Sequence, residues 1–261
     1  MSGEARIEAR KEGALGWMIF DNPARRNAVS VSMWEAIPGV LDQFAADPEI
    51  RVVVLAGAGD KAFVSGADIS QFESQRSGPE AVQRYEEIAE GAQARLQACD
   101  KPTVAMIRGY CLGAGVNIAN VCDLRIAATD ARIGIPAARI GLGYRASLTK
   151  NLVDVVGGAN AREMLLTGWQ YSAVQAKEMG LVHHVVAVPE LESFTRKLCD
   201  DIAANAPLTM RTAKRIIGEV SKRDYDAALC RSWVKECFES ADYAEGRKAF
   251  MEKRKPIFRG R

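Results

Sequence analysis

The segments Ser65-Gly66-Ala67-Asp68-Ile69 and Gly113-Ala114-Gly115-Val116-Asn117 decide how this sequence is interpreted. Both are rich in small residues, which allow a backbone amide to approach a ligand closely. The second segment opens an apolar, helix-like run over residues 116–121, so its free N–H groups would lie at the start of a helix. Two such amides that converge on one point would form an oxyanion hole, which stabilises negative charge on a carbonyl oxygen.

Around these two segments, the sequence alternates between strand and helix patterns. Buried strands are predicted over residues 51–56, 103–107 and 123–127. Helices are expected from Ser30 or Ser32 to Ala46, where Pro38 interrupts the pattern, and from Pro79 to about Ala98. This alternation is typical of an α/β fold. From about residue 190 the pattern is helical, over residues 190–204, 208–220, 225–238 and 243–253, so we place a domain boundary there.

Composition excludes several classes of partner. The chain has 261 residues with 35 Lys and Arg against 33 Asp and Glu. Because positive charge is not in clear excess, we do not expect nucleic acid as a partner. The six cysteines lack Cys-x-x-Cys spacing, which favours reduced thiols over disulfides or a zinc site, and we expect no metal. There is no apolar run of transmembrane length and no signal-peptide core. We therefore expect a cytoplasmic enzyme that does not bind membranes.

A series of fragments, in this order and spacing, resembles the enoyl-CoA hydratase/isomerase, or crotonase, superfamily over nearly the whole chain. The fragments are residues 22–28 (Asn-Pro-Ala-Arg-Arg-Asn-Ala), 61–69, 101–105, 109–115, 123–127, 180–182 and 250–256. The resemblance implies a spiral of ββα units over residues 1–190, which would hold the site for coenzyme A and the oxyanion hole. It further implies a helical trimerisation region over residues 191–261, homotrimers or dimers of trimers, and an acyl-CoA substrate with no separate cofactor.

The resemblance also assigns residues to the site. Matched by position, the backbone amides of Ala67 and Ala114 would form the oxyanion hole, although tight turns used only for packing would look the same. The residues beside these amides would bind the substrate, namely Ser65, Gly66, Asp68, Ile69 and Gly113. Residues 67–69 would border the adenine pocket, and Arg25 would lie near the CoA phosphates.

The sequence departs from the family pattern at the expected catalytic carboxylates. Family hydratases carry one glutamate three residues after the second oxyanion amide and another just after a proline. Here these positions hold Asn117 and Ala137, and neither can transfer a proton at neutral pH. Asn117 would either satisfy a helix end or orient a substrate carbonyl or a water. Ala137 would line the substrate site.

Tyr144 and Arg145 stand where the family has small residues. The position of Tyr144 resembles that of a pocket tyrosine in the family's methylmalonyl-CoA decarboxylases, which have a histidine where this chain has Ala67. Both residues would either cap the next helix or recognise a second polar group on the acyl chain. A carboxylate bound by Arg145 would then be a distal one that stays attached.

Taken together, these residues favour a crotonase-family lyase or isomerase that stabilises a thioester enolate. Decarboxylation, or another non-hydratase reaction on a short functionalised acyl-CoA, is the main expectation, because CO₂ leaves without accepting a proton. Tyr144 or water would then protonate the enolate, and thioester hydrolysis and carbon–carbon cleavage could use the same oxyanion hole. One alternative is an enoyl-CoA hydratase or isomerase with other proton-transfer groups, and another is a catalytically silent acyl-CoA-binding subunit.

Overall fold

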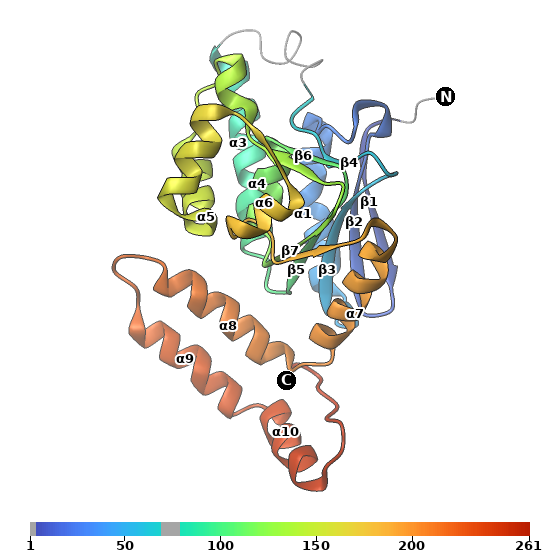
Figure 1. Cartoon of the computed structure of the whole chain (residues 1–261). Helices are drawn as coiled ribbons and strands as arrows, with labels where there is room; N and C mark the ends of the chain where they lie inside the picture. The colour runs from blue at the N-terminus through green and yellow to red at the C-terminus, as the bar shows by residue number, and fades with distance from the viewer. Residues whose placement is uncertain (1–3, 69–78) are drawn as a thin grey trace.

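The computed structural model describes residues 4–68 and 79–261, and its strands form two sheets (Figure 1). The larger sheet has the order β1 (Arg6–Glu12), β2 (Leu15–Asp21), β3 (Val52–Gly57), β5 (Thr103–Ile107), β7 (Leu124–Ala128) and β10 (His184–Val186). The smaller sheet has the order β4 (Ala62–Val64), β6 (Tyr110–Leu112), β8 (Arg132–Gly134) and β9 (Gln170–Ser172).

Successive ββα units connect the two sheets. In each unit the first strand joins the larger sheet and the second joins the smaller one. The units are β3, β4 and α3 (Pro79–Gln97), then β5, β6 and α4 (Ala114–Asn120), then β7, β8 and α5 (Ala146–Thr167), which follows the short helix η3 (Pro136–Ile140). β4, β6 and β8 run parallel, so the segments that follow them meet at one edge of the smaller sheet. The predicted α/β fold, a spiral of ββα units, is confirmed.

Several predicted elements are confirmed with small shifts in their ends. Helix α1 (Val31–Ala46) begins after Ser30, whose side chain accepts a hydrogen bond from the N–H of Met33 at 3.2 Å, and it contains Pro38. Strand β6, which directly precedes the second small-residue segment, was not predicted from the sequence. A strand of three residues is too short to show the alternation by which strands are recognised in a sequence.

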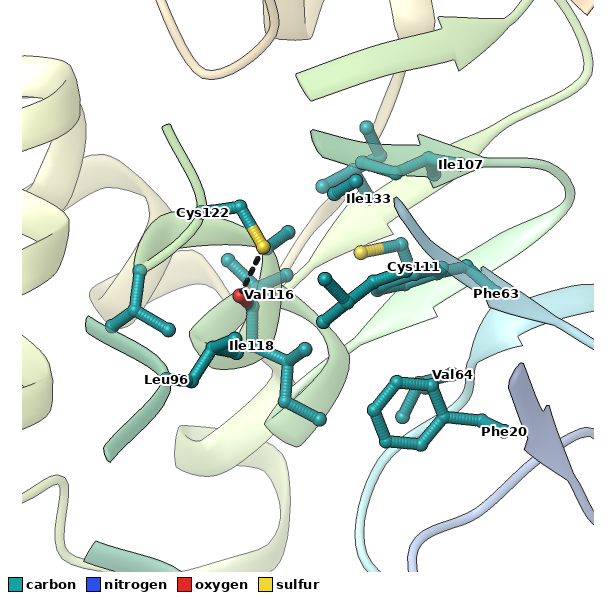
Figure 2. Close-up of a cluster of buried hydrophobic side chains, with 14 of the residues drawn as sticks. Phe20, Phe63, Val64, Leu96, Ile107, Cys111, Val116, Ile118, Cys122 and Ile133 are labelled. Carbon is teal, nitrogen blue, oxygen red and sulfur yellow. Dashed lines mark hydrogen bonds between the residues drawn. The ribbon is translucent and has the colours of Figure 1, made fainter. Parts of the chain in front are cut away.

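A buried apolar cluster includes residues beside and within the two small-residue segments (Figure 2). Val64 precedes the first segment, Val116 belongs to the second, and both side chains are buried in this cluster. The thiol of Cys122 donates a hydrogen bond to the carbonyl of Ile118 at 3.3 Å. Burial raises the pKa of Cys122 to about 12, so the thiol is protonated at neutral pH and acts as a packing group.

The helices after residue 190 fall into two groups. Helix α7 (Leu191–Ala203), which follows α6 (Ala173–Glu178) and η4 (Val188–Glu190), packs on the larger sheet through Leu191 and Cys199. Helices α8 (Pro207–Val220), α9 (Ala227–Phe238) and α10 (Ala241–Glu252) extend away from both sheets (Figure 1). The predicted helical content is confirmed, and the division of the chain at residue 190 stays a prediction. In the described ranges, no helix is both long and apolar enough to cross a membrane.

Candidate active site

The two small-residue segments touch each other at the ends of β4 and β6. A Cβ added to Gly115 would lie 2.2 Å from the carbonyl oxygen of Val64, and one added to Gly113 would lie 4.0 Å from the Cα of Gly66. Gly66 (φ 129°) and Gly113 (φ 51°) both adopt positive φ angles, which L side chains rarely accept. Glycine is therefore required both for the backbone conformation and for the contact between the segments.

The first segment is held in place by residues 26–29. The N–H of Val29 donates to the carbonyl of Gly66 at 2.9 Å, and the N–H of Asp68 donates back to the carbonyl of Val29 at 3.0 Å. The N–H of Ser65 donates to the carbonyl of Arg26 at 3.2 Å. These bonds fix the backbone on both sides of Ala67 without using the Ala67 amide.

The amides of Ala67 and Ala114 remain available as donors. Neither N–H has an acceptor within residues 4–68 and 79–261. Both residues are half-buried and line the same cavity. A pair of fixed backbone donors at a partly enclosed cavity is what an oxyanion hole requires.

This cavity has a volume of about 240 Å³ and lies between the two segments, α3 and the start of α5. Its wall is mostly apolar with a few polar groups, which is usual for a small-molecule site. The buried lining residues are Trp34, Ala89, Gln93, Asn117, Ile135, Ala137 and Leu148, and the exposed ones include Ile140 and Leu142. The cavity thus has a buried wall and a solvent-exposed rim.

Asn117 and Tyr144 form a hydrogen-bonded pair in the cavity wall. The phenol of Tyr144 donates to Oδ1 of Asn117, whose side chain is only 7% exposed. Burial raises the pKa of Tyr144 above its ordinary value, and the hydrogen bond with Asn117 offsets only part of this. The phenol is therefore protonated at neutral pH. Asn117 uses its oxygen for Tyr144 and not for the end of helix α4.

Arg145 also lines the cavity, but other protein groups already bind its guanidinium. It occupies the N-cap position of α5 without a capping hydrogen bond from its side chain. Its Nη1 lies 3.2 Å from Oε1 of Glu90 and donates to the backbone carbonyl of Glu86 at 3.2 Å. Ser147 donates to the same oxygen of Glu90 at 2.8 Å. The predicted recognition of an acyl substituent by Arg145 stays a prediction.

Glu86 is the carboxylate that lines this cavity in the part of the chain that the structure describes. Its side chain is half-buried, and Asp68, the residue after Ala67, is not part of the lining. Neither Glu86 nor Gln93 was predicted from the sequence. Positions 86, 89 and 93 share one face of a helix, but this spacing alone does not distinguish a polar residue in a cavity wall from a solvent-facing one.

The remaining predicted site residues lie at the edge of this geometry or outside it. Arg25 ends the short helix η1 (Pro23–Arg25), is exposed, and accepts a hydrogen bond from Oγ of Ser65 at 3.2 Å through its carbonyl. Arg25 therefore adjoins the first segment through its backbone. Ile69 lies outside the described residues. Among residues 4–68 and 79–261, no group of three His, Cys, Asp or Glu side chains could hold a metal ion.

Comparisons with known proteins place these features in a family. The family model for enoyl-CoA hydratase/isomerase matches residues 10–261. The chain is 32% identical over 247 residues to the short-chain-enoyl-CoA hydratase of Clostridium acetobutylicum, with 94% of each chain covered. It is 30% identical over 257 residues to the 2,3-dehydroadipyl-CoA hydratase of Escherichia coli, with 98% of each chain covered.

A solved structure of similar sequence also shares the fold of this chain. An enoyl-CoA hydratase/carnithine racemase from Magnetospirillum magneticum is 33% identical and superposes with a TM-score of 0.92, covering 98% of this chain and 96% of that chain. These matches extend over both the ββα units and the C-terminal helices. The chain belongs to the enoyl-CoA hydratase/isomerase, or crotonase, family.

Proposed function

We propose that the protein binds an acyl-CoA thioester with its carbonyl oxygen between the amides of Ala67 and Ala114. The observation that carries this proposal is the pair of unused donors on two segments in contact beside one cavity. Charge that moves onto the thioester oxygen as an enolate forms would be stabilised there. Removing one donor of such a pair typically costs on the order of a hundred- to thousandfold in rate.

The reaction proposed is hydration or isomerisation of an enoyl-CoA. The names of the relatives favour this reaction over the non-hydratase reaction expected from the sequence. Both reactions require proton transfer at carbon, and Glu86 is the carboxylate that lines the described cavity. We assign proton transfer to Glu86, and the Tyr144 phenol, which stays protonated, acts as a hydrogen-bond donor.

Decarboxylation of a malonyl-type thioester is the second candidate. It is favoured by Asn117 and Ala137, which the family resemblance matches to the two glutamates of the hydratases. Loss of CO₂ moves an electron pair into the thioester and yields the same oxyanion-stabilised enolate, with only one protonation to follow. A silent acyl-CoA-binding subunit would show binding without either reaction.

A panel assay separates these candidates. Crotonyl-, malonyl-, methylmalonyl- and 3-hydroxybutyryl-CoA would each be tested for turnover and for a rise in the melting temperature, because any ligand that prefers the folded state stabilises it. We expect measurable crotonyl-CoA turnover that is slower than the roughly 10 s⁻¹ of an ordinary enzyme. Release of CO₂ without enoyl turnover would instead support the decarboxylase. Lack of stabilisation by every CoA thioester would contradict acyl-CoA binding.

A homotrimer, or a dimer of trimers, is also part of the proposal. It is supported by the exposed apolar side chains of the C-terminal helices and tail, including Phe238, Phe250, Met251 and Ile257. Sedimentation analysis would give the mass of the assembly, and a stable monomer would contradict it. We retain a cytoplasmic location as a proposal, which the six free cysteines support.

A further inference from the structure

Gln93 presents an unused primary amide in the buried wall of the cavity. The residue lies on α3, one turn after Ala89, and is only 6% exposed. Its Oε1 is buried without a hydrogen-bond partner, and its Nε2 has no partner within residues 4–68 and 79–261. A buried polar group without a partner is unfavourable, so such groups in proteins call for an explanation.

Three other polar side chains that line this cavity are already paired. The indole Nε1 of Trp34 donates to the hydroxyl of Tyr85 at 3.1 Å. The phenol of Tyr144 is bound to Asn117, and the guanidinium of Arg145 is bound to Glu90, as described above. Gln93 offers a ligand a buried amide whose carbonyl oxygen has no hydrogen-bond partner in the described part of the chain.

We propose that Gln93 selects an acyl group that carries a hydroxyl, through a hydrogen bond between that hydroxyl and the Gln93 amide. This inference rests on the proposed binding of an acyl-CoA thioester. The terminal torsion of a glutamine is broad and roughly two-fold, so the amide can turn either its oxygen or its NH₂ group toward the cavity. A hydroxyl both donates and accepts, and it therefore pairs with either orientation.

The surroundings of Gln93 argue against a carboxylate at this point. Trp34 (1% exposed), Ala89 (2%) and Leu148 (7%) form the buried apolar wall together with Gln93. An ionised carboxylate would lose its hydration there, and the Gln93 amide carries no charge to compensate. Gln93 lies on α3 and not on the segments that hold the oxyanion amides, so we place its partner on the acyl chain and not at the thioester carbonyl.

The test uses two ligands that differ by one distal hydroxyl, butyryl-CoA and 4-hydroxybutyryl-CoA, and compares their dissociation constants by calorimetry. We expect the wild-type protein to bind the hydroxylated ligand roughly tenfold more tightly, and Gln93→Met to lose this preference. Gln97→Met is the matched control, because Gln97 is exposed one turn further along α3, and it should keep the preference.

Thermal unfolding without ligand supplies a second readout. Because the Gln93 amide has no partner among residues 4–68 and 79–261, an apolar side chain of similar length should leave the melting temperature unchanged or raise it. A clearly lower melting temperature in both Gln93→Met and Gln93→Leu would assign Gln93 to the structure of the wall and overturn the proposal.

The binding results keep the two proposals apart. Equal binding of both ligands to the wild-type protein, or a preference that survives in Gln93→Met, overturns the role of Gln93 and leaves acyl-CoA binding intact. Failure of both thioesters to bind overturns the role of Gln93 and the proposed function together.

Discussion

Replacement of Gly115 by alanine tests whether contact between the two segments creates the oxyanion hole. The added Cβ would lie 2.2 Å from the carbonyl oxygen of Val64, whereas real Cβ atoms essentially never approach a neighbour closer than 3.0 Å. The segments must therefore separate by about 0.8 Å. A misplacement of about 1 Å at a catalytic group can cost on the order of a hundredfold in rate, and we expect kcat/KM to fall by about that factor.

The stability of the same variant separates this effect from unfolding. In an open helix, glycine to alanine would be favourable by about 1 kcal/mol, but here the clash should lower stability by roughly 1–3 kcal/mol. The assay pairs melting temperature with turnover of the most rapidly converted substrate of the panel. Gly39→Ala in α1 is the matched control, because a Cβ there meets nothing within 4 Å, and it should be fully active. Wild-type kcat/KM in Gly115→Ala would show that the close contact between Gly115 and Val64 does not position the oxyanion amides.

Three further substitutions test other parts of the account. Tyr144→Phe leaves Oδ1 of Asn117 without its donor and should cost about 1–3 kcal/mol of stability, measured by chemical unfolding, and an unchanged value would mean that the bond contributes nothing. Glu86→Gln should lower enoyl-CoA turnover by roughly 10²–10⁴ while butyryl-CoA still binds, and undiminished turnover would exclude Glu86 as the proton-transfer group. Hydrogen bonds from Arg254 lower the pKa of Glu245 to about 2, so their stabilisation is present above pH 4.5 and is lost as the pH falls toward 2. The difference in melting temperature between wild type and Glu245→Gln should accordingly vanish near pH 2, and a difference that does not change with pH would exclude this linkage.

Patterns carried by long, apolar segments were predictable from the sequence. The strand over 103–107 has the predicted ends because four of its five positions are buried and residues 104–107 form a continuous apolar run. Helix α1 begins where Ser30 can accept a backbone hydrogen bond, which is a local signal. The smaller sheet was not predictable in this way, because β4, β6, β8 and β9 have three residues each and carry no period. Its place in the spiral came from the family resemblance.

The candidate site also has parts that were predictable from the sequence and parts that were not. The two glycine-rich segments were visible because backbone geometry and close approach restrict the residue type, and the structure brings both segments into contact. Gln93 and Glu86 were not visible, because a polar residue beside the apolar face of a helix looks like any solvent-facing one. The pairing of Tyr144 with Asn117 also joins residues 27 positions apart, and only the folded arrangement of α4 and the segment before α5 shows it.

Isotope-edited infrared spectroscopy of a bound thioester reports directly on the hydrogen bonds to its carbonyl oxygen, whatever the reaction. Butyryl-CoA labelled with ¹³C at its carbonyl would be bound to the wild-type protein and to Gly115→Ala, with free butyryl-CoA as the reference. If the amides of Ala67 and Ala114 hold the carbonyl oxygen, its stretching band should move to lower frequency in the wild-type complex and return toward the free value in the variant. A band at the frequency of free butyryl-CoA in a saturated wild-type complex would contradict the account.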